Sequence, residues 1–564
     1  MDLLKRDPRK NVFRELAMKM WKGRAAWLAV FAYLVVGFLG TAQAKDASVL
    51  EFDADWRLDG DLPEKAMLIS LQGVVNKGGP ELYFLYPESW PWKITGELKG
   101  FYESRHGFDF KDLGSAEAAL AEHASKVSGY VVWDKEVRTS LIVAFTVCGL
   151  QNAIAVNEDL IPLAEAAGLK PVADLRGDFR GMDDAEIYEI AYDRYWGKTS
   201  KDVVIWMGGA HGSRMEPGLA DYGIYREAFF CDLSASPEDE AELALHNKIL
   251  SELNPDATIM GWHSYGKDTE GQHVSLISSY GLKMEGLNSL PNISFNCQIP
   301  FTDDFVFKNN HNVAPEETLD AEETVYVSLV QTDSMGIGAW TKPGRGRIPY
   351  AWQVSMSWSR TSPAALQYFA EAATPNDYFI AGLSGPGYMY PKPIPERRFW
   401  PLMDEAEELM EALDLRVMEI MDYSEGNRHV GNTDLPKSLV DRYYKAFPGV
   451  IGFINGYGSA RTFDLRGERP MVSYDYYLGL HRPTEEAIAD LEELIQLNRK
   501  RPYFLLIHVR ESTTIDRVAD ILEGVSEEME VVSLDVFLKL AASEQTYKQR
   551  YLQGSDPVDR NAYR

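Results

Sequence analysis

Cysteine is scarce in this sequence of 564 residues, and metal-binding patterns are missing from it. The three cysteines, Cys148, Cys231 and Cys297, cannot all pair within one chain, and each stands beside apolar residues. We therefore expect buried free thiols rather than a disulfide framework. No CxxC, HExxH or HxxxH spacing occurs, so nothing local supports a zinc or metal-hydrolase site. We predict a protein that works without a metal or another cofactor.

Basic side chains are also few. The chain has 57 lysines and arginines against 85 aspartates and glutamates, a formal net charge of −28 at pH 7. Such a negative field repels nucleic acid and anionic lipid, and we expect neither as a partner. Neutral or cationic small substrates remain open, although acidity also simply keeps a secreted protein in solution.

Long hydrophobic runs are absent except at the N-terminus. Eight basic residues precede the uncharged run Ala25–Gly40, and Ala42-Gln43-Ala44 follows it. This order is typical of a secretory signal peptide, which we predict to span residues 1–44 with cleavage after Ala44. An uncleaved anchor is the alternative, but the run is shorter than the roughly 20 residues of a comfortable span. We expect a secreted or periplasmic protein with no stable membrane insertion after cleavage.

Nucleotide-binding patterns and low-complexity tracts are missing as well. The glycine-rich turn Gly208–Gly212 lacks GxGxxG or GK[ST] spacing and a basic phosphate partner, so we do not interpret it as a nucleotide loop. Hydrophobic residues make up 45% of the chain, and its length exceeds what one ordinary core supports. We expect a globular protein of two or more domains.

Apolar runs of strand length alternate with helical patterns through the rest of the chain. Residues 45–310 predict two or three small α/β modules, with candidate strands at 81–86, 129–134, 153–156, 202–207, 229–233 and 258–262. A polar link over 300–323 suggests a boundary. Residues 320–545 predict strands at 324–331, 378–383, 416–421, 450–454, 503–509 and 530–534, separated by helices at 363–373, 403–413, 436–447, 484–500 and 514–524.

This alternation predicts an α/β fold class. We expect a C-terminal (β/α)-barrel-like domain over 320–545, preceded by smaller α/β N-terminal domains and followed by a polar tail over 546–564. An open doubly wound sheet is the alternative for the C-terminal domain.

Polar residues follow the ends of the C-terminal strands. Because sites in parallel α/β folds form at the carboxyl ends of strands, we expect these residues on one rim. Hydrolysis of a glycosidic bond normally needs two carboxyl groups, and the rim offers four catalytic candidates: Asp333, Asp422, Glu425 and Glu511. Each also has a local explanation as a helix cap, an ion-pair partner or a solvated side chain.

Rings, amides and glycines add the features of a sugar site. The loop Ser384–Pro391 holds two glycines, two tyrosines and two prolines directly after an apolar run. It is either a structural turn or a rigid aromatic wall for a ligand. We predict nine substrate-binding residues: Gly385, Gly387, Tyr388, Tyr390, Trp340, Asn455, His508, Trp262 and His263. The last two belong to the first half of the chain and reach the rim only if the domains pack across it.

Taken together, Gly385, Gly387, Tyr388, Tyr390 and Pro391 match every fixed position of the heptad that names the GxGYxYP family of putative glycoside hydrolases, which the chain resembles. The stretches Leu71–Asn76, Gly261-Trp262 and Ala373–Tyr378 are also similar to that family. The resemblance covers nearly the whole mature chain and implies glycan hydrolysis. Many members carry an Asp-Gly-Asp-Asn-like run where this chain has Thr332-Asp333-Ser334-Met335, so Met335 stands where a second acid is expected.

The sequence therefore predicts a glycosidase that acts on a poly- or oligosaccharide through a carboxylate pair at the C-terminal rim. A non-catalytic glycan-binding protein on the same scaffold is the first alternative, which Met335 favours. A metal-dependent carbohydrate esterase is the second, and it requires clustered histidine and aspartate ligands.

Overall fold

The computed structural model of the protein describes residues 45–208, 214–333, 340–427 and 430–552. The predicted signal peptide, most of the glycine-rich turn, Met335 and the end of the polar tail lie outside these residues. From Asp46 onward the described residues belong to one compact unit.

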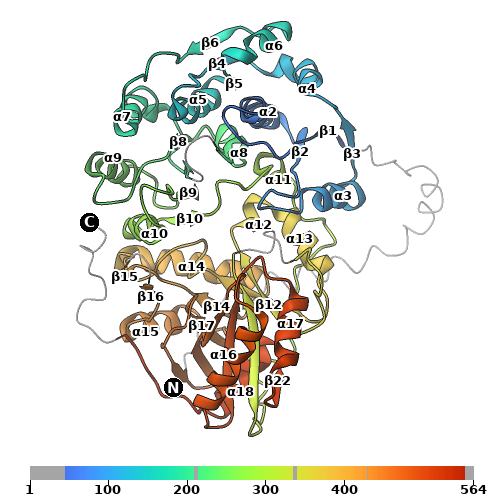
Figure 1. Ribbon diagram of the computed structural model, residues 1–564, viewed down its shortest axis with the longest axis vertical. Coiled ribbons are helices and arrows are strands. Elements are labelled where there is room, and N and C mark those ends of the chain that lie inside the picture. The colour runs from blue at the N-terminus through green and yellow to red at the C-terminus, as the bar shows by residue number, and fades with distance from the viewer. Residues whose placement is uncertain (1–44, 209–213, 334–339, 428–429, 553–564) are drawn as a thin grey trace, which may run out of the picture. The chain divides into compact units, whose positions relative to one another are not determined.

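Three small sheets make up the N-terminal part of the chain (Figure 1). Their strand orders are β2 (Leu82–Leu85)-β1 (Lys45–Glu51)-β3 (Phe108–Asp112), β5 (Ala153–Val156)-β4 (Gly129–Val132)-β6 (Pro171–Asp174) and β10 (Lys283–Glu285)-β9 (Thr258–Trp262)-β7 (Val203–Met207)-β8 (Phe229–Cys231). The pair β4 and β5 is parallel across a helical connection and forms a βαβ unit. The β7, β8, β9 and β10 pairs are parallel as well.

Helices surround these sheets. They are α2 (Leu62–Val75), α3 (Thr95–His106), α4 (Ala116–His123), α5 (Arg138–Gln151), α6 (Ile161–Ala166), α7 (Asp184–Tyr195), α8 (Ala220–Tyr225), α9 (Glu240–Ser251), α10 (Glu270–Ser279) and α11 (Ile293–Asn296). Helix α2 is apolar on nearly all sides and packs against both β5 and α8. Gly73 fits this junction because a Cβ there would lie 2.5 Å from the Asp221 carbonyl oxygen.

Strands buried on both faces form the large C-terminal sheet. Its order is β18 (Asp464–Arg466)-β19 (Arg469–Ser473)-β17 (Gly452–Asn455)-β14 (Val417–Ile420)-β13 (Asp377–Gly382)-β12 (Tyr350–Ser355)-β11 (Val325–Gln331)-β21 (Tyr503–Val509)-β20 (Tyr476–Leu478), and β22 (Met529–Val531) pairs with the start of β11. Every neighbour pair is parallel except β18 and β19. Continuous apolar strands of this kind fit a parallel sheet covered by helices.

The hydrogen-bonded path of this sheet does not close within the described residues. Its ends nevertheless come together, because only Tyr474 and Asp475 separate β19 from β20. The Tyr474 amide bonds to the Asn455 carbonyl of β17, and the Asp475 amide bonds to the Leu506 carbonyl of β21. The mixed α/β class is confirmed, and the barrel-like closure stays a prediction.

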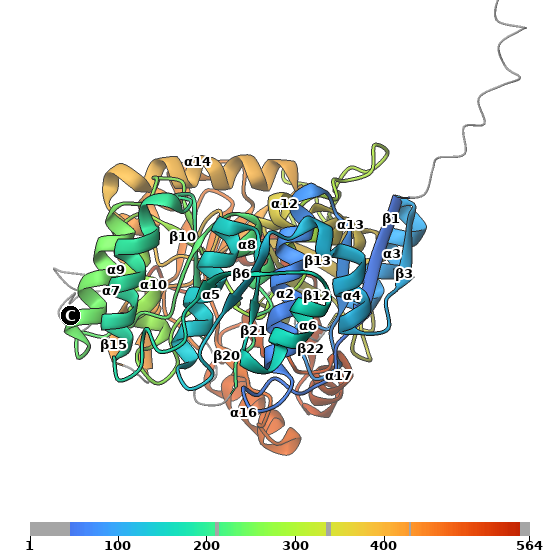
Figure 2. The same cartoon turned by 90° about the horizontal axis from the view of Figure 1, so that it is seen from above.

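Helices of the C-terminal region connect these strands. They are α12 (Trp358–Thr361), α13 (Pro363–Ala372), α14 (Glu396–Ala412), α15 (Lys437–Ala446), α16 (Thr484–Leu497), α17 (Ile515–Gly524) and α18 (Leu534–Ser543), and a hairpin of β15 (Glu425–Asn427) and β16 (Val430–Asn432) follows β14. Figure 2 shows α14 along its length. It starts at Glu396, well before the predicted Met403, and continues through Pro401, which lies inside the helix and lacks the N–H for one backbone hydrogen bond. Lys283 of β10 pairs with Glu405 of α14 at 2.6 Å and ties the third small sheet to this helix.

Two further details bear on the sequence predictions. The cysteines are free thiols, with Cys148 and Cys231 buried and Cys297 half-buried. Among the described residues, no helix has both the length and the apolar character needed to cross a bilayer.

The start of β13 depends on the buried carboxylate of Asp377. It accepts hydrogen bonds from the Trp352 indole at 2.8 Å, from Arg345 at 2.8 Å and from the Thr374 amide at 2.7 Å. Asp377→Ala leaves these buried donors unpaired, and we expect it to lower the free energy of unfolding by about 2–4 kcal/mol. Asp404→Ala on the exposed face of α14 is the control, expected within about 0.5 kcal/mol of the parent in urea denaturation. Equal stability of the two variants would contradict this role.

Candidate active site

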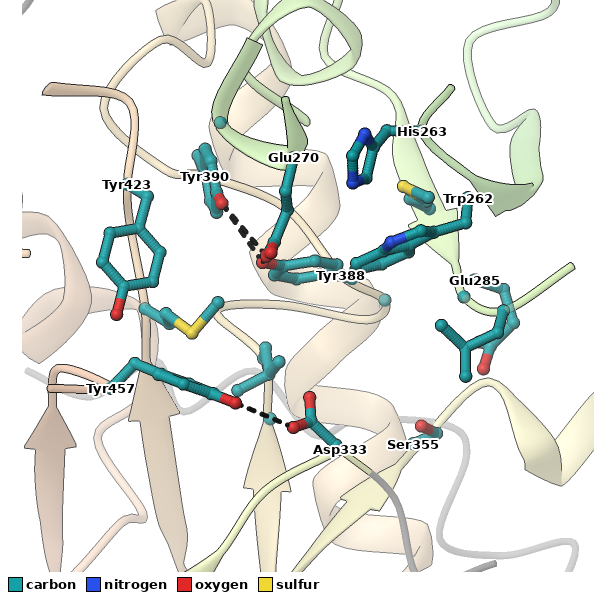
Figure 3. A pocket seen from close by; sticks show the side chains of 18 of the residues that line it. Trp262, His263, Glu270, Glu285, Asp333, Ser355, Tyr388, Tyr390, Tyr423 and Tyr457 are labelled. Carbon is teal, nitrogen blue, oxygen red and sulfur yellow. Dashed lines mark hydrogen bonds between the residues drawn. The ribbon is translucent and has the colours of Figure 1, made fainter. Parts of the chain in front are cut away.

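A cavity of about 780 Å³ lies between the third small sheet and the carboxyl ends of the C-terminal strands. One wall comes from the C-terminal sheet, through Ser355, Asp333, Tyr457 and Glu511. The facing wall comes from the segment after β9 and from the start of α10. Figure 3 shows side chains from both walls directed into the same space. Trp262 and His263 line this cavity, so the first half of the chain does reach the rim.

Asp333 and Glu511 form an interacting carboxyl pair on the C-terminal wall. Asp333 follows β11 with a backbone φ of 64°, a left-handed conformation that aspartate tolerates better than most residues. Its carboxylate accepts a hydrogen bond from the Tyr457 hydroxyl at 3.1 Å. Glu511 follows β21 and pairs with the Arg510 guanidinium at 2.6 Å. Arg510 also donates to the Tyr457 hydroxyl, so one cation serves both acids.

Burial sets the protonation of this pair. It raises the pKa of Asp333, while the Arg510 charge and hydrogen bonds from Tyr457 and Glu511 oppose that shift. Burial and then the Asp333 charge raise the pKa of Glu511 to about 7. Because two neighbouring carboxyls resist double ionisation, the pair retains a proton to higher pH than either acid would alone.

Glu270 stands on the facing wall at the first residue of α10. Thr269 and Gln272 form a capping box that fixes this helix start. The Glu270 carboxylate accepts hydrogen bonds from the Tyr388 hydroxyl and, at 3.4 Å, from the Tyr390 hydroxyl. Burial raises its pKa, the two hydroxyls lower it, and the Asp333 charge raises it further.

Every fixed position of the heptad at 385–391 except its final proline has a contact that explains it. A Cβ on Gly385 would lie 2.7 Å from the Met389 sulfur, and one on Gly387 would lie 3.0 Å from the Met284 carbonyl. That closeness lets Tyr388 exchange two backbone hydrogen bonds with Met284 of β10, at 2.8 and 2.9 Å. The Tyr390 amide bonds to the Ser278 hydroxyl at 2.9 Å. The heptad therefore joins the C-terminal sheet to the third small sheet.

Other predicted site residues lie behind the cavity rather than on it. Asp422 accepts from the Lys392 amide at 2.7 Å, and both Asp422 and Glu425 lie within 4 Å of the Lys392 ammonium. These two acids thus anchor the chain just after the heptad. Trp340 packs on Trp352 and Phe369 in the core.

Two more predicted residues are buried beneath the strand ends. Asn455 donates to the Ser473 hydroxyl at 3.3 Å. His508 contacts the Tyr457 carbonyl at 2.7 Å and the Thr332 hydroxyl at 2.9 Å, and burial lowers its pKa to about 3. The neutral His508 ring supports Tyr457, which in turn holds Asp333.

Sequence reasoning missed Glu270, Glu285, Arg510 and Tyr457. Glu285 is buried at the end of β10, where it accepts from the Trp358 indole at 3.0 Å and from the Ser357 hydroxyl. Burial raises its pKa to about 7. A local signal existed for Glu270 only as the Thr269–Gln272 capping box, which marks a helix start and says nothing of the facing strands. Within the described part of the chain, no cluster of three or more histidine, cysteine or acidic side chains could hold a metal.

Comparison with known proteins places the chain in the GxGYxYP family. The family's 1st domain matches residues 50–125, its second domain 127–199, its third domain 201–298, and its "putative glycoside hydrolase C-terminal domain" 323–542. The chain belongs to this family. Its fold is similar to a crystal structure described as a putative hydrolase from Bacteroides thetaiotaomicron, with a TM-score of 0.71 and 20% identity over 90% of this chain and 96% of that one. A search of curated proteins found no match.

A buried carboxyl beneath the site yields a pH prediction. Glu419 of β14 accepts from the Tyr474 hydroxyl at 2.6 Å, and burial, with the Asp333 charge, raises its pKa to about 8. The folded state then holds a proton that the unfolded state releases, so Glu419 stabilises the fold at acidic pH. The ordinary pKa of a glutamate is 4.5. This stabilising contribution is lost as the pH rises from 4.5 through the folded-state pKa of about 8.

We therefore expect Glu419→Gln to weaken the fall in melting temperature between pH 5 and pH 8.5. Glutamine keeps an acceptor for Tyr474 and has no proton to lose. Glu408→Gln on the exposed face of α14 is the matched control and should leave the pH dependence unchanged. An identical pH dependence for Glu419→Gln and the parent would show that Glu419 does not titrate in this range.

Proposed function

We propose that the protein is a glycoside hydrolase that cleaves a poly- or oligosaccharide in the cavity between the third small sheet and the C-terminal strands. The observation that carries this proposal is one pocket with interacting carboxyls, Asp333 and Glu511, facing the aromatic rings of Trp262 and Tyr388. Glycosidases use acidic pairs to move protons and to compensate the positive charge of the transition state. Family membership supports the same chemistry.

The rings suit a sugar substrate. Trp262 and Tyr388 lie nearly parallel, with ring centroids 6.1 Å apart and an interplanar angle of 14°. Such faces cover the C–H surfaces of a sugar, while carboxylates and hydroxyls bind its hydroxyl groups. Among the described residues, the lining includes five acidic side chains, Asp268, Glu270, Glu285, Asp333 and Glu511, and one arginine, Arg510. This balance favours a neutral or amino sugar over a uronic acid.

The cellular location and the domain organisation stay predictions from the sequence. We propose secretion or periplasmic export through residues 1–44, a C-terminal barrel-like domain over 320–545 and smaller domains over 45–310. No metal or other cofactor has a part in the proposed reaction. Asp422 and Glu425 take no part in it either, because Lys392 lies between them and the cavity does not reach them.

The direct test is a screen of the mature protein against diverse polysaccharides and oligosaccharides, with detection of reducing ends. On a substrate found in this way, Asp333→Asn and Glu511→Gln should each lower kcat/KM by about 10²–10⁴-fold, because each removes a titrating group from the pair. Asp404→Asn on α14 is the matched control and should keep full activity. Full turnover by both amide variants would overturn the assignment.

A non-catalytic glycan-binding role gives a different result. Binding on a glycan array, without release of reducing ends and without any effect of the amide changes, would replace the hydrolase proposal with this one.

A further inference from the structure

The contact between Asp333 and Glu511 limits what this pair does alone. Cleavage of a glycosidic bond needs one carboxyl on the leaving-group side of the sugar and another on the opposite face, with separations of about 5–5.5 Å or about 6.5–9.5 Å. Asp333 and Glu511 interact directly and stand on the same wall. They therefore act as one carboxyl unit, and a partner must come from the facing wall.

We propose that Glu270, held by the tyrosines of the heptad, is the catalytic proton donor that faces Asp333 across the cavity. This inference rests on the proposed glycoside hydrolase function and deepens it. It makes the active site composite, with the acid from the third N-terminal domain and the opposing carboxylate from the C-terminal domain.

The placement of Glu270 carries the proposal. Figure 3 shows Glu270 entering the cavity from one side and Asp333 from the other. Both are half-buried and line the cavity, so a substrate can reach them. The two also affect each other electrostatically, since the Asp333 charge is among the causes that raise the pKa of Glu270.

The other acids of the cavity are already engaged. Asp268 binds the His263 ring at 3.0 Å and the Ala235 amide at 2.8 Å. Glu285 is buried against Trp358 and Ser357. Among the described residues, the hydrogen-bond donors to Glu270 are the hydroxyls of Tyr388 and Tyr390. Burial raises the pKa of Glu270 above its ordinary value, which is the direction that a general acid requires.

The proton balance is simple. As the bond between C1 and the glycosidic oxygen breaks, its electron pair stays on that oxygen, which takes the proton of the Glu270 carboxyl. The Asp333 carboxylate, supported by Arg510 and Glu511, compensates the positive charge on C1 and the ring oxygen. The water that completes hydrolysis gives its hydroxyl to C1 and its proton to the carboxyl groups. The enzyme ends with as many protons as it had.

This role also explains why the heptad has two tyrosines. Tyr388 and Tyr390 belong to the C-terminal domain, whereas Glu270 belongs to α10, and the backbone pairing of Tyr388 with Met284 fixes the two elements together. The tyrosine hydroxyls, 3.2 Å apart, both point to the same carboxylate oxygen. They are positioning residues that set the orientation and the acidity of Glu270.

The first experiment compares leaving groups on the sugar that the substrate screen identifies. With a phenyl glycoside, whose leaving group needs protonation, we expect Glu270→Gln to lower kcat/KM about 10²–10⁴-fold. With the 2,4-dinitrophenyl glycoside, whose leaving group departs as a stable anion, the loss should stay below about 10-fold. Glu285→Gln is the matched control from the same cavity, and any loss should be equal on both substrates.

The outcomes separate the two proposals. Absence of turnover by the parent protein on every glycoside overturns the hydrolase function itself. An active parent with a Glu270→Gln variant that loses the same factor on both substrates, or loses nothing, overturns the role of Glu270 alone.

The second experiment measures the pH dependence of kcat/KM for Tyr388→Phe and Tyr390→Phe. A general acid must be protonated, so activity falls as pH rises above the pKa of that acid. Each tyrosine hydroxyl stabilises the Glu270 carboxylate and lowers its pKa, so its removal should move the basic limb upward by about one pH unit. An unchanged basic limb in both variants, with melting temperatures like the parent, would overturn the positioning role.

Discussion

Two backbone hydrogen bonds between Tyr388 and Met284 connect the two walls of the cavity. They join the loop after β13 to the edge strand β10, and so they align the C-terminal sheet with the third small sheet. Together with the Lys283–Glu405 ion pair, this pairing holds Glu270 of one domain in place relative to Asp333 of the other. Gly387 suits this close approach, because a Cβ there would lie 3.0 Å from the Met284 carbonyl oxygen. The heptad therefore connects two domains, and its tyrosine hydroxyls donate hydrogen bonds to Glu270 in the cavity.

Burying a carboxylate in the cavity removes it from water, which is unfavourable. Neighbouring charges and hydrogen bonds offset this desolvation. Arg510 faces both Asp333 and Glu511, and hydroxyls serve Glu270 and Glu419. Glu285 and Glu419 bond to hydroxyl or indole groups instead of a cation. Burial raises the pKa of both acids, which favours their neutral form. A site of this kind concentrates protonated carboxyls near neutral pH, which is the condition that acid catalysis of glycoside cleavage needs.

Local patterns predicted the long apolar strands well and the mixed ones poorly. The strands at β11, β13 and β21 were found because most of their residues are apolar. Strand β12 was missed, since Gln353 interrupts its apolar pattern. That strand carries Ser355 to the rim and separates β11 from β13, and with β18, β19 and β20 it is one of four strands that the predicted sheet lacked.

The sequence by itself determined the α/β alternation, the heptad, the family resemblance and the position of Asp333 and Glu511 after parallel strands. These follow from short-range patterns, because strand burial and turn chemistry are encoded within a few residues. Only the tertiary structure decided which acids share a cavity. Asp422 and Glu425 follow a strand as Asp333 does. Both nevertheless pair with Lys392 and lie outside the cavity. Glu270 lies more than sixty residues before Asp333 in the chain, and packing between two domains brings the two acids face to face.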